Sequence, residues 1–421
     1  MDKNNLNIPN QFGYKKSHST ESLLIQIVDE ILIASDKKSA TVIMLLDLSA
    51  AFDTVDHNKL IRILEKEIGI VGSPLRWFRS FITNRTQKVK IGNVYSEEVV
   101  LKYGVPQGSV LGPVLFNIYI RSLYKHVNGT TFNIKGFADD HQVYKSFLPI
   151  FQKKVLIDDI KNCFQSIKYW MDFYFLKLNS DKTEIIVFSP SNYLKGNLII
   201  SGTFLEQNGT CVRFANTASN LGVLFDKFLT FEPQVNKIVS TCFYTIKNLS
   251  KIRDYLSLKD LKILVCSLVL SKLDYCNSLL YGINGELLRK LQSVQNAAAR
   301  LIFRKRKFDH ISESIKELHW LRINERICYK IITSVHNALY SNHPHFPLKD
   351  RITVLNERTM LLFIPMTSSS FGRRSFSFIG PKMWNSLPVD FRLDSSFVSF
   401  KGKLKHLLFN DSDRYSQLIN S

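Results

Sequence analysis

The spacing of apolar residues alternates between helical and strand periods over the first 190 residues. After the capping residues His18 to Thr20, a helical stripe is formed by Leu23, Leu24, Ile27, Val28, Ile31 and Leu32. The continuous apolar run 41–46 predicts a buried strand that ends at Asp47. The pattern further predicts helices over 57–67, 112–122 and 152–175, and strands over 86–91, 99–101, 184–188 and 197–200. This mixture indicates an α+β fold.

From about residue 235 the spacing becomes helical throughout. Leu287, Leu291, Val294, Ala298 and Ile302 form one apolar stripe, and basic residues occupy the other faces. We therefore predict a small helical bundle over 235–310 that packs through one face. The remaining residues, 311–421, form a third unit whose fold the pattern does not define. Its aromatic residues could stack on bases, but a place in the core is the favoured interpretation for Trp320, Phe371, Phe376, Phe378 and Trp384.

Two acidic sites stand far apart in the chain. Asp47 follows the apolar strand, and the pair Asp139-Asp140 follows the segment 135–138. Carboxylates brought together in this way repel each other unless divalent cations lie between them. Two-metal phosphoryl transfer needs such oxygen ligands, and aspartates that only cap turns are the alternative. We predict that these residues hold two Mg²⁺ ions, with Mn²⁺ as the alternative, and that Asp47 and Asp139 are the direct ligands.

The segments between and around the acidic sites identify a family. Residues 104–113 form a Gly- and Pro-rich turn in which Pro113 suits the first turn of a helix. The chain here resembles the reverse transcriptases of non-LTR retrotransposons of the jockey or chicken-repeat type. The resemblance is carried, in this order, by 10–14, 47–53, 105–109, 137–140, 178–179, 182–183 and 220–223, and more weakly by 380–388.

The resemblance implies an RNA-directed DNA polymerase, which adds deoxynucleoside triphosphates to a DNA primer on an RNA template. It implies a right-hand palm with partial fingers over 1–234, an α-helical thumb over 235–310 and a helical C-terminal region over 311–421. A telomerase or intron maturase relative is less favoured, because the amino-acid sequences of 47–52 and of the C-terminal stretch 380–388 match the retrotransposon type.

The resemblance also assigns roles within the site. Lys182 would lie near the triphosphate, and Phe52 would exclude a ribose 2′-hydroxyl by collision. The nucleotide and template would be contacted by Leu48, Gln107, Gly108 and Ser109, and the primer end supported by Leu221 and Gly222. The simpler alternatives are a core Phe52, a plain helix-initiating loop at 107–109 and a solvated Lys182. His57 and His141 lack a partner at ligand spacing, so both are predicted to be structural.

The charge of the chain favours a polyanionic partner. The formal net charge is +20, and residues 236–310 hold fourteen Lys and Arg against five Asp and Glu. We predict that a template–primer duplex is held through its phosphates by Lys247, Lys251, Arg253, Arg289, Lys290, Arg300, Arg304, Lys305, Arg306 and Lys307. The alternative for the run 304–307 is a solvated basic surface that only aids solubility.

The resemblance to the family starts at a motif that is not the first one of the family's fingers region. In that family a fingers segment with an Arg-Pro-Ile motif precedes the motif found here at Gln11, and its Arg grips the incoming triphosphate. Only ten residues precede Gln11, and none is Arg. We therefore expect an N-terminally truncated copy with an intact metal site and an incomplete nucleotide grip. An inactive remnant that only binds nucleic acid is the alternative, and salt-sensitive binding without metal-dependent incorporation would favour it.

The remaining features indicate an intracellular protein with no membrane partner. The six cysteines form no Cys-x-x-Cys pair and are predicted to be reduced core thiols. The polar start of the chain is not a signal peptide. Lys262 and Lys272 interrupt the most apolar stretch, around 261–273, so no segment is expected to span a bilayer.

Overall fold

The computed structural model describes residues 8–148, 153–179, 181–189, 204–207, 210–341 and 346–410. It divides into two compact units. The first takes its residues from Met1–Lys16, Thr41–Val187 and Asn192–Asn216, and the second from Ser17–Ala40, Phe188–Ser191 and Thr217–Ser421. These units follow the packing of the chain and are divided differently from the predicted regions 1–234, 235–310 and 311–421, which stay a prediction.

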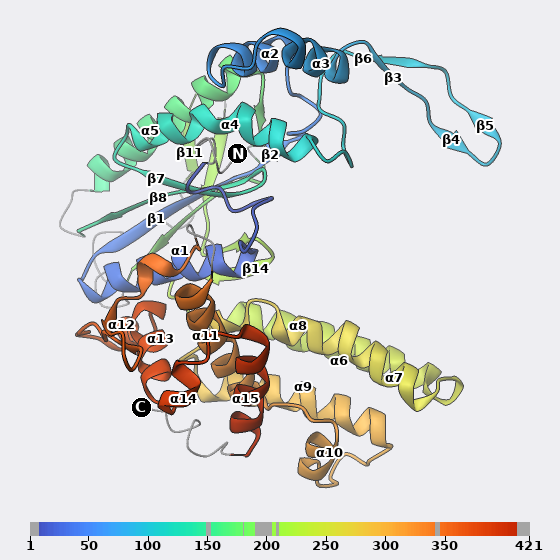
Figure 1. Ribbon diagram of the computed structural model, residues 1–421, viewed down its shortest axis with the longest axis vertical. Coiled ribbons are helices and arrows are strands. Elements are labelled where there is room, and N and C mark those ends of the chain that lie inside the picture. Colours follow the sequence, from blue (N-terminus) through green and yellow to red (C-terminus); the bar gives the residue numbers. More distant parts are fainter. Residues whose placement is uncertain are drawn as a thin grey trace. The chain divides into compact units, whose positions relative to one another are not determined.

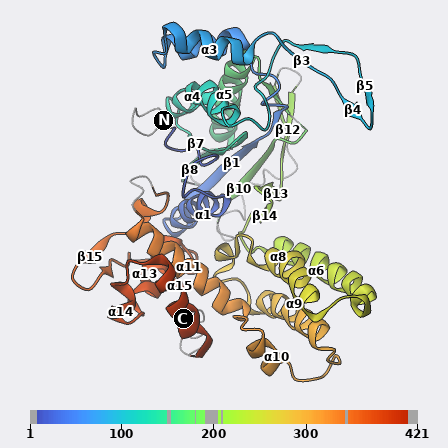
Figure 2. The ribbon, with the colours of Figure 1, turned by 45° about the vertical axis from the view of Figure 1, so that its right-hand side comes forward.

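The first unit is an α+β layer structure (Figures 1 and 2). Its six-stranded sheet has the order β11-β12-β10-β1-β8-β7, and helices α4 and α5 lie together on one face of it. The elements are β1 (Ala40–Leu46), β2 (Leu48–Ser49), α2 (His57–Lys66), α3 (Gly72–Ile82), β3 (Arg85–Gln87), β4 (Lys90–Ile91), β5 (Val94–Tyr95), β6 (Val99–Leu101), α4 (Gly112–Asn128), β7 (Asn133–Phe137), β8 (Asp140–Phe147), α5 (Lys153–Phe173), β9 (Lys177–Leu178), β10 (Glu184–Phe188), β11 (Phe204–Gln207) and β12 (Thr210–Phe214).

Most of the predicted elements of this unit are present. Strand β1 is buried along almost its whole length, as its unbroken apolar sequence requires. Helix α4 continues six residues past the predicted end, because Leu123, Tyr124 and Val127 extend its buried face. The predicted strand 86–91 is wrong in part: it breaks into β3, which pairs with β6, and β4, which forms a tight hairpin with β5.

The remaining differences concern elements that the pattern did not predict. Helix α3 and strands β11 and β12 were not predicted. Leu75, Phe78 and Ile82 stand at helical spacing in α3, so its apolar pattern was present in the sequence and was overlooked. The predicted strand 197–200 lies outside the described residues.

The second unit is mainly helical, as predicted for the C-terminal half. Its elements are α1 (Thr20–Asp36), β13 (Thr217–Asn220), β14 (Val223–Asp226), α6 (Glu232–Ile252), α7 (Leu258–Val265), α8 (Ser271–Asp274), α9 (Gly285–Phe303), α10 (Ser312–Glu317), α11 (Ile323–Tyr340), β15 (Val354–Asn356), β16 (Leu361–Leu362), α12 (Ser370–Arg373), α13 (Phe376–Asn385), α14 (Val389–Arg392) and α15 (Phe397–Asn410).

Helix α1 belongs to this second unit because polar contacts tie both of its ends there. Glu21 accepts a hydrogen bond from the Ser278 hydroxyl at 2.6 Å. At the other end, the Asp36 carboxylate accepts from the backbone N–H groups of Ser368 and Ser369 at 3.0 and 2.7 Å. These contacts join residues more than 250 positions apart, which the local pattern of a sequence cannot predict.

The aromatic residues of the C-terminal region serve its core. Trp320, Phe376 and Trp384 are buried, which confirms the core interpretation for these three. The Trp384 indole N–H donates to the Met360 carbonyl at 2.8 Å, and the Asn385 amide bonds both backbone groups of Leu362 at 2.9 and 2.8 Å. In this structure the segment 380–388 therefore anchors the β15–β16 hairpin.

Two further observations concern the described part of the chain as a whole. No helix in it is both long enough and apolar enough to cross a membrane. Cys163, Cys242, Cys276 and Cys328 are free and buried, in agreement with the predicted core thiols. Cys266 is free but exposed, so the core prediction is wrong for this residue.

Candidate active site

The turn between β7 and β8 carries the paired aspartates. Phe137 and Asp140 are the last paired residues of the hairpin, so Ala138 and Asp139 form a two-residue turn. Ala138 adopts φ +58°, a conformation that costs energy for a residue other than glycine. The hydrogen bonds of a buried neighbour stabilise this turn.

That neighbour is Gln11, whose side chain is fully buried. Its Nε2 donates to the Ala138 carbonyl at 2.9 Å. Its Oε1 accepts from the backbone N–H groups of Ala138 and Gly13, both at 2.9 Å. Both backbone groups of Ala138 are thus satisfied by one amide, which fixes the position of the adjacent Asp139.

The segment around Gln11 also lies alongside the hairpin. The Phe12 N–H donates to the Gly136 carbonyl at 2.7 Å, and the Gly136 N–H donates to the Asn10 carbonyl at 2.9 Å. A Cβ atom on Gly13 would lie 2.3 Å from the Ala138 nitrogen, so only glycine fits there. Sequence reasoning named 10–14 only as part of the resemblance and assigned Gln11 no contact of its own.

Asp47 lies where β1 ends and the short strand β2 begins. Strand β2 pairs with β9, and the Asn179 N–H donates to the Asp47 carbonyl at 2.8 Å. The loop after β9 places the Lys182 ammonium 3.9 Å from Asp47 Oδ2, with 71% of the lysine side chain exposed. An exposed ion pair of this length contributes little to stability, so Lys182 remains available to a ligand.

The structure brings the three predicted carboxylates into mutual influence. Asp47 and Asp139 are half-buried, and Asp140 is exposed. Partial desolvation, with the negative charges of Asp139 and Asp47, raises the pKa of Asp140 to about 6. Two segments more than 90 residues apart thus create one centre of negative charge.

The donor set fits a hard divalent cation. Within the described residues no group of three or more His, Cys, Asp or Glu side chains is arranged to hold a metal ion by itself. Mg²⁺ rarely uses a full protein cage: it commonly binds through one or two carboxylates and completes its shell with water and substrate phosphates. Asp47 and Asp139 supply carboxylates of this kind, and the mutual repulsion with Asp140 favours a bound cation.

Phe52 is half-buried. This exposure agrees in part with a core residue and in part with a ring that meets the sugar of a nucleotide. One face stacks on Phe116, with ring centroids 4.4 Å apart and planes at 24°. The Tyr14 ring meets it edge-on at 6.3 Å. Desolvation and the charge of Asp139 raise the pKa of Tyr14, which therefore lies close to both Phe52 and the carboxylates. Sequence reasoning assigned Tyr14 no role of its own.

The turn at 104–112 packs against the chain that follows Asp47. The Val105 N–H donates to the Phe52 carbonyl at 2.9 Å, and the Gln107 Nε2 donates to Asp53 Oδ1 at 2.8 Å. The Ser109 hydroxyl accepts from the N–H of Gly112 at 3.0 Å, so it serves the start of α4. Gly108 has φ +78° and open space around it, which leaves the backbone accessible.

The two predicted primer-supporting residues form the tip of the β13–β14 hairpin in the second unit. Leu221 and Gly222 have φ values of +46° and +81°, the pattern of a type I′ turn. The Tyr275 hydroxyl donates to the Leu221 carbonyl at 2.7 Å. A leucine in the left-handed region is strained, and strain of this kind is common at functional turns.

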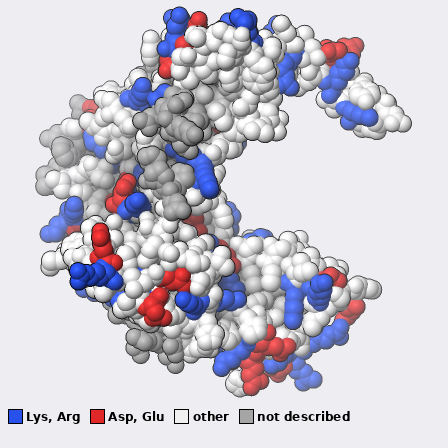
Figure 3. Space-filling model, in the orientation of Figure 1, with Lys and Arg blue, Asp and Glu red and all other residues white. Residues whose placement is uncertain are grey.

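The predicted nucleic-acid-binding residues lie on and beside α6 and α9 of the second unit. Several have partners within the protein: Arg253 donates to the Ile302 carbonyl, Arg304 pairs with Asp254 at 2.8 Å, and Lys290 donates to Asn236. Figure 3 shows basic and acidic side chains intermingled around the end of α9 and α10. Of the predicted set, Arg253 therefore has a clear structural task, which is to cap α9.

Both histidines near the site are structural, as predicted. His57 is buried and its Nε2 lies 2.8 Å from the Gly104 carbonyl oxygen. His141 is buried beneath the turn, with Nδ1 2.7 Å from the Asp139 carbonyl oxygen. Burial lowers the pKa of His141 to about 4, so the ring is neutral at physiological pH.

Comparison with known proteins places the chain in a family. The family model described as reverse transcriptase (RNA-dependent DNA polymerase) matches residues 1–223. This match covers more than half of the 421 residues, and the chain therefore belongs to the reverse transcriptase family. Membership of this family indicates a right-hand polymerase fold.

Three Drosophila melanogaster proteins illustrate the relationship, each 27% identical to this chain. The probable RNA-directed DNA polymerase from transposon BS matches over 253 residues, which are 57% of this chain and 26% of the relative. The RNA-directed DNA polymerase from mobile element jockey matches over 237 residues, 54% of this chain and 24% of the relative. The probable RNA-directed DNA polymerase from transposon X-element matches over 317 residues, 72% of this chain and 32% of the relative. The matches confirm the predicted non-LTR retrotransposon relationship. The chain spans about a quarter to a third of the length of these relatives.

The Gln11 contacts generate a prediction. Replacing Gln11 with Ala leaves a buried N–H and a buried carbonyl of Ala138 unpaired, at a cost of roughly 3 kcal/mol. Amide hydrogen exchange in the peptide that spans the β7–β8 turn should then become about a hundredfold faster. Gln107→Ala, which removes one exposed hydrogen bond, is the matched control and should leave this exchange nearly unchanged. Equal effects of the two substitutions would contradict the role of Gln11.

Proposed function

We propose that this chain carries out RNA-directed DNA synthesis, adding deoxynucleoside triphosphates to a DNA primer on an RNA template. The observation that supports this most directly is the meeting of Asp47, Asp139 and Asp140 in a member of the reverse transcriptase family. In this proposal, residues 1–234 comprise partial fingers and the palm, 235–310 the thumb, and 311–421 a C-terminal region of separate role.

Two Mg²⁺ ions bound by Asp47 and Asp139 would supply the charge that activates the primer 3′-hydroxyl and stabilises the leaving pyrophosphate, and Mn²⁺ could replace them. Asp140 adds negative charge beside the two ligands. Lys182, whose ammonium already lies 3.9 Å from Asp47, would neutralise the triphosphate or protonate the pyrophosphate. Its exposed side chain leaves it free to reach a bound nucleotide.

The residues around Phe52 would select and orient the nucleotide. The ring of Phe52 is held from beneath by Phe116, so it cannot withdraw from a sugar placed above it. Leu48, on the strand that leaves Asp47, and the exposed Gln107 and Gly108 would complete the nucleotide and template contacts, with Ser109 fixing the turn that carries them. Rigid support of this kind makes discrimination by collision effective.

The second unit would hold the nucleic acid. The strained turn Leu221-Gly222, fixed by Tyr275, would support the primer end. Lys and Arg side chains on α6 and α9 would contact phosphates of the template–primer duplex without reading its sequence.

The metal ligands generate the first prediction of this proposal. Primer extension on poly(A)/oligo(dT) with Mg²⁺ should fall by roughly a thousandfold or more in Asp139→Asn, because metal charge stabilisation contributes several kcal/mol. Binding of Mn²⁺, followed by its electron paramagnetic resonance signal, should weaken in parallel. Asp158→Asn, which changes an exposed carboxylate on α5, is the control. Incorporation by Asp139→Asn at the wild-type rate would contradict the metal assignment.

The second prediction concerns sugar discrimination. Phe52→Val removes the ring that would collide with a 2′-hydroxyl, so the ratio of kcat/KM for UTP to that for dTTP should rise roughly tenfold or more. The measurement is single-nucleotide incorporation with each substrate. If both values fall by the same factor, Phe52 serves only the core.

The third prediction concerns the basic run 304–307. Changing these four residues to Ala should weaken binding to unrelated duplexes about equally and reduce the slope of log K against log[salt] by up to about 3.5. Lys37→Ala/Lys38→Ala, at two exposed lysines, controls for a general change of charge. Unchanged affinity and slope in the quadruple variant would mean that the run is only a solvated surface, and the metal site would be unaffected by this result.

A further inference from the structure

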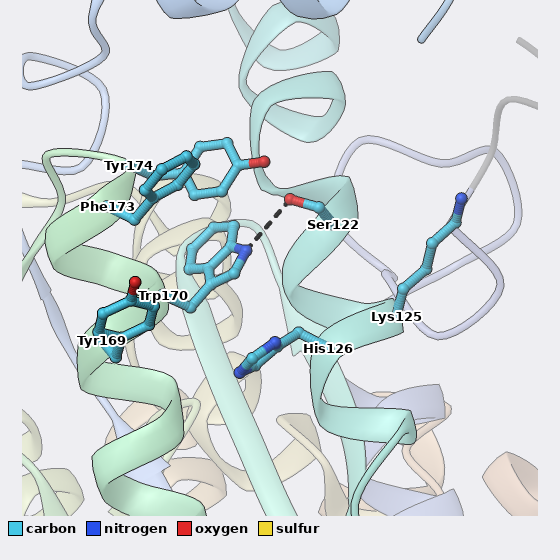
Figure 4. Close-up of a pocket in the computed structure, with 7 residues that line it drawn as sticks. All are labelled: Ser122, Lys125, His126, Tyr169, Trp170, Phe173 and Tyr174. Atoms are coloured by element: carbon cyan, nitrogen blue, oxygen red, sulfur yellow. Dashed lines mark hydrogen bonds between the residues drawn. The ribbon is translucent and has the colours of Figure 1, made fainter.

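A cleft of about 430 Å³ opens between α4 and α5 in the first unit. Its α5 wall is aromatic, and Ser122 and His126 face that wall from α4 (Figure 4). No residue to which we assign nucleotide addition lines the cleft. The aromatic wall consists of Tyr169, Trp170, Phe173 and Tyr174.

The four rings form two neighbouring rows on the last turn of α5 and the residue that follows it, because Tyr169 and Phe173, and likewise Trp170 and Tyr174, are four residues apart. Trp170 and Tyr174 form the inner row. They stack at 4.3 Å with planes at 23°, and the buried indole donates to the Ser122 hydroxyl at 3.2 Å. The inner row therefore serves as a fixed wall.

The outer row is exposed to solvent. Tyr169 is 70% exposed, Phe173 is 57% exposed, and the nearby Phe175 is 60% exposed. Rings at this exposure contribute little to the core of the unit, and neighbouring exposed aromatic residues mark surfaces that bind a partner. Of the outer rings, Phe173 contacts the inner row: it meets the Tyr174 ring edge-on, with centroids 5.3 Å apart.

Positive charge lies directly beside these rings. The Lys59 ammonium is 3.5 Å from the Phe173 ring centroid and 4.7 Å from that of Phe175. Lys125 is exposed at the rim of the cleft on α4, and its side chain extends away from the aromatic wall (Figure 4). On the α5 side, residues 166–178 include two lysines and one acidic residue, Asp172. Exposed aromatic rings beside cations suit a nucleic acid, whose bases can stack on the rings and whose phosphates can contact the cations.

We propose that this cleft binds single-stranded nucleic acid, with unpaired bases stacking on Tyr169 and Phe173 and phosphates beside Lys59 and Lys125. The bases of a duplex are already stacked on each other and cannot reach these rings, so the cleft selects unpaired strands. RNA and DNA share this chemistry, and the test compares both. The cleft shares no lining residue with the proposed nucleotide-addition site, and it would add a second contact for the template or another unpaired strand.

Photochemical cross-linking tests the proposal directly. Short single strands of RNA or DNA that carry 5-iodouracil react under ultraviolet light with aromatic side chains on which the base stacks. Trypsin cleaves after Lys168 and Lys177, so one peptide, 169–177, contains all the rings concerned. We expect the cross-link in this peptide, with competition by unlabelled single strands and not by a blunt duplex. Cross-links found only elsewhere, or equal competition by duplex, would overturn the proposal.

Variants separate stacking from a general effect. Tyr169→Ala/Phe173→Ala should reduce single-strand affinity about tenfold or more and remove the cross-link, whereas Tyr169→Phe, which keeps the ring, should retain it. Phe363→Ala, at a ring 50% exposed in the second unit, is the matched control. Equal loss in the control and the double variant, or no loss in either, would overturn the proposal.

The cross-link does not depend on catalysis, so it can fail independently of the proposed polymerase activity. Asp139→Asn should keep the cross-link in 169–177 while incorporation is lost. If wild-type protein incorporates nucleotides but gives no cross-link in this peptide, the cleft assignment fails and the polymerase assignment stands.

Discussion

Electrostatic repulsion among Asp47, Asp139 and Asp140 is the constraint on which the arrangement of the first unit depends. Carboxylates that lie together at a partly desolvated site repel each other, so they move apart or take up protons. They stay together and charged only where the backbone holds them and a cation neutralises them. Desolvation, followed by the charges of Asp139 and Asp47, raises the pKa of Asp140. The fold keeps the carboxylates together at a cost in free energy, as is common at functional sites.

The surrounding contacts are arranged to hold the carboxylates in place. On one side, Gln11 satisfies both backbone groups of Ala138, and Gly13 permits the close approach that this needs. On the other side, β9 pairs with β2, and Asn179 bonds the backbone of Asp47. The site therefore rests on backbone geometry at four separate segments of the chain, which explains why the matching motifs are dispersed in the sequence.

The sequence predicted those parts of the fold that depend on local pattern. The apolar run of β1, the helical stripes and the acidic residues at strand ends were all predictable because each leaves a periodic or chemical signal. The contacts of Gln11, Tyr14 and Asp36 were not, since each joins positions distant in sequence and depends on the folded arrangement. The aromatic cleft was missed because its rings resemble an ordinary core face.

Diffraction from crystals that contain Mn²⁺, a template–primer and a non-hydrolysable deoxynucleotide analogue tests the central claim most directly. The claim predicts two anomalous peaks about 3.5–4 Å apart, within coordination distance of the Asp47 and Asp139 carboxylates. Peaks confined to other carboxylates, or no peak beside these two with the nucleotide bound, would contradict it.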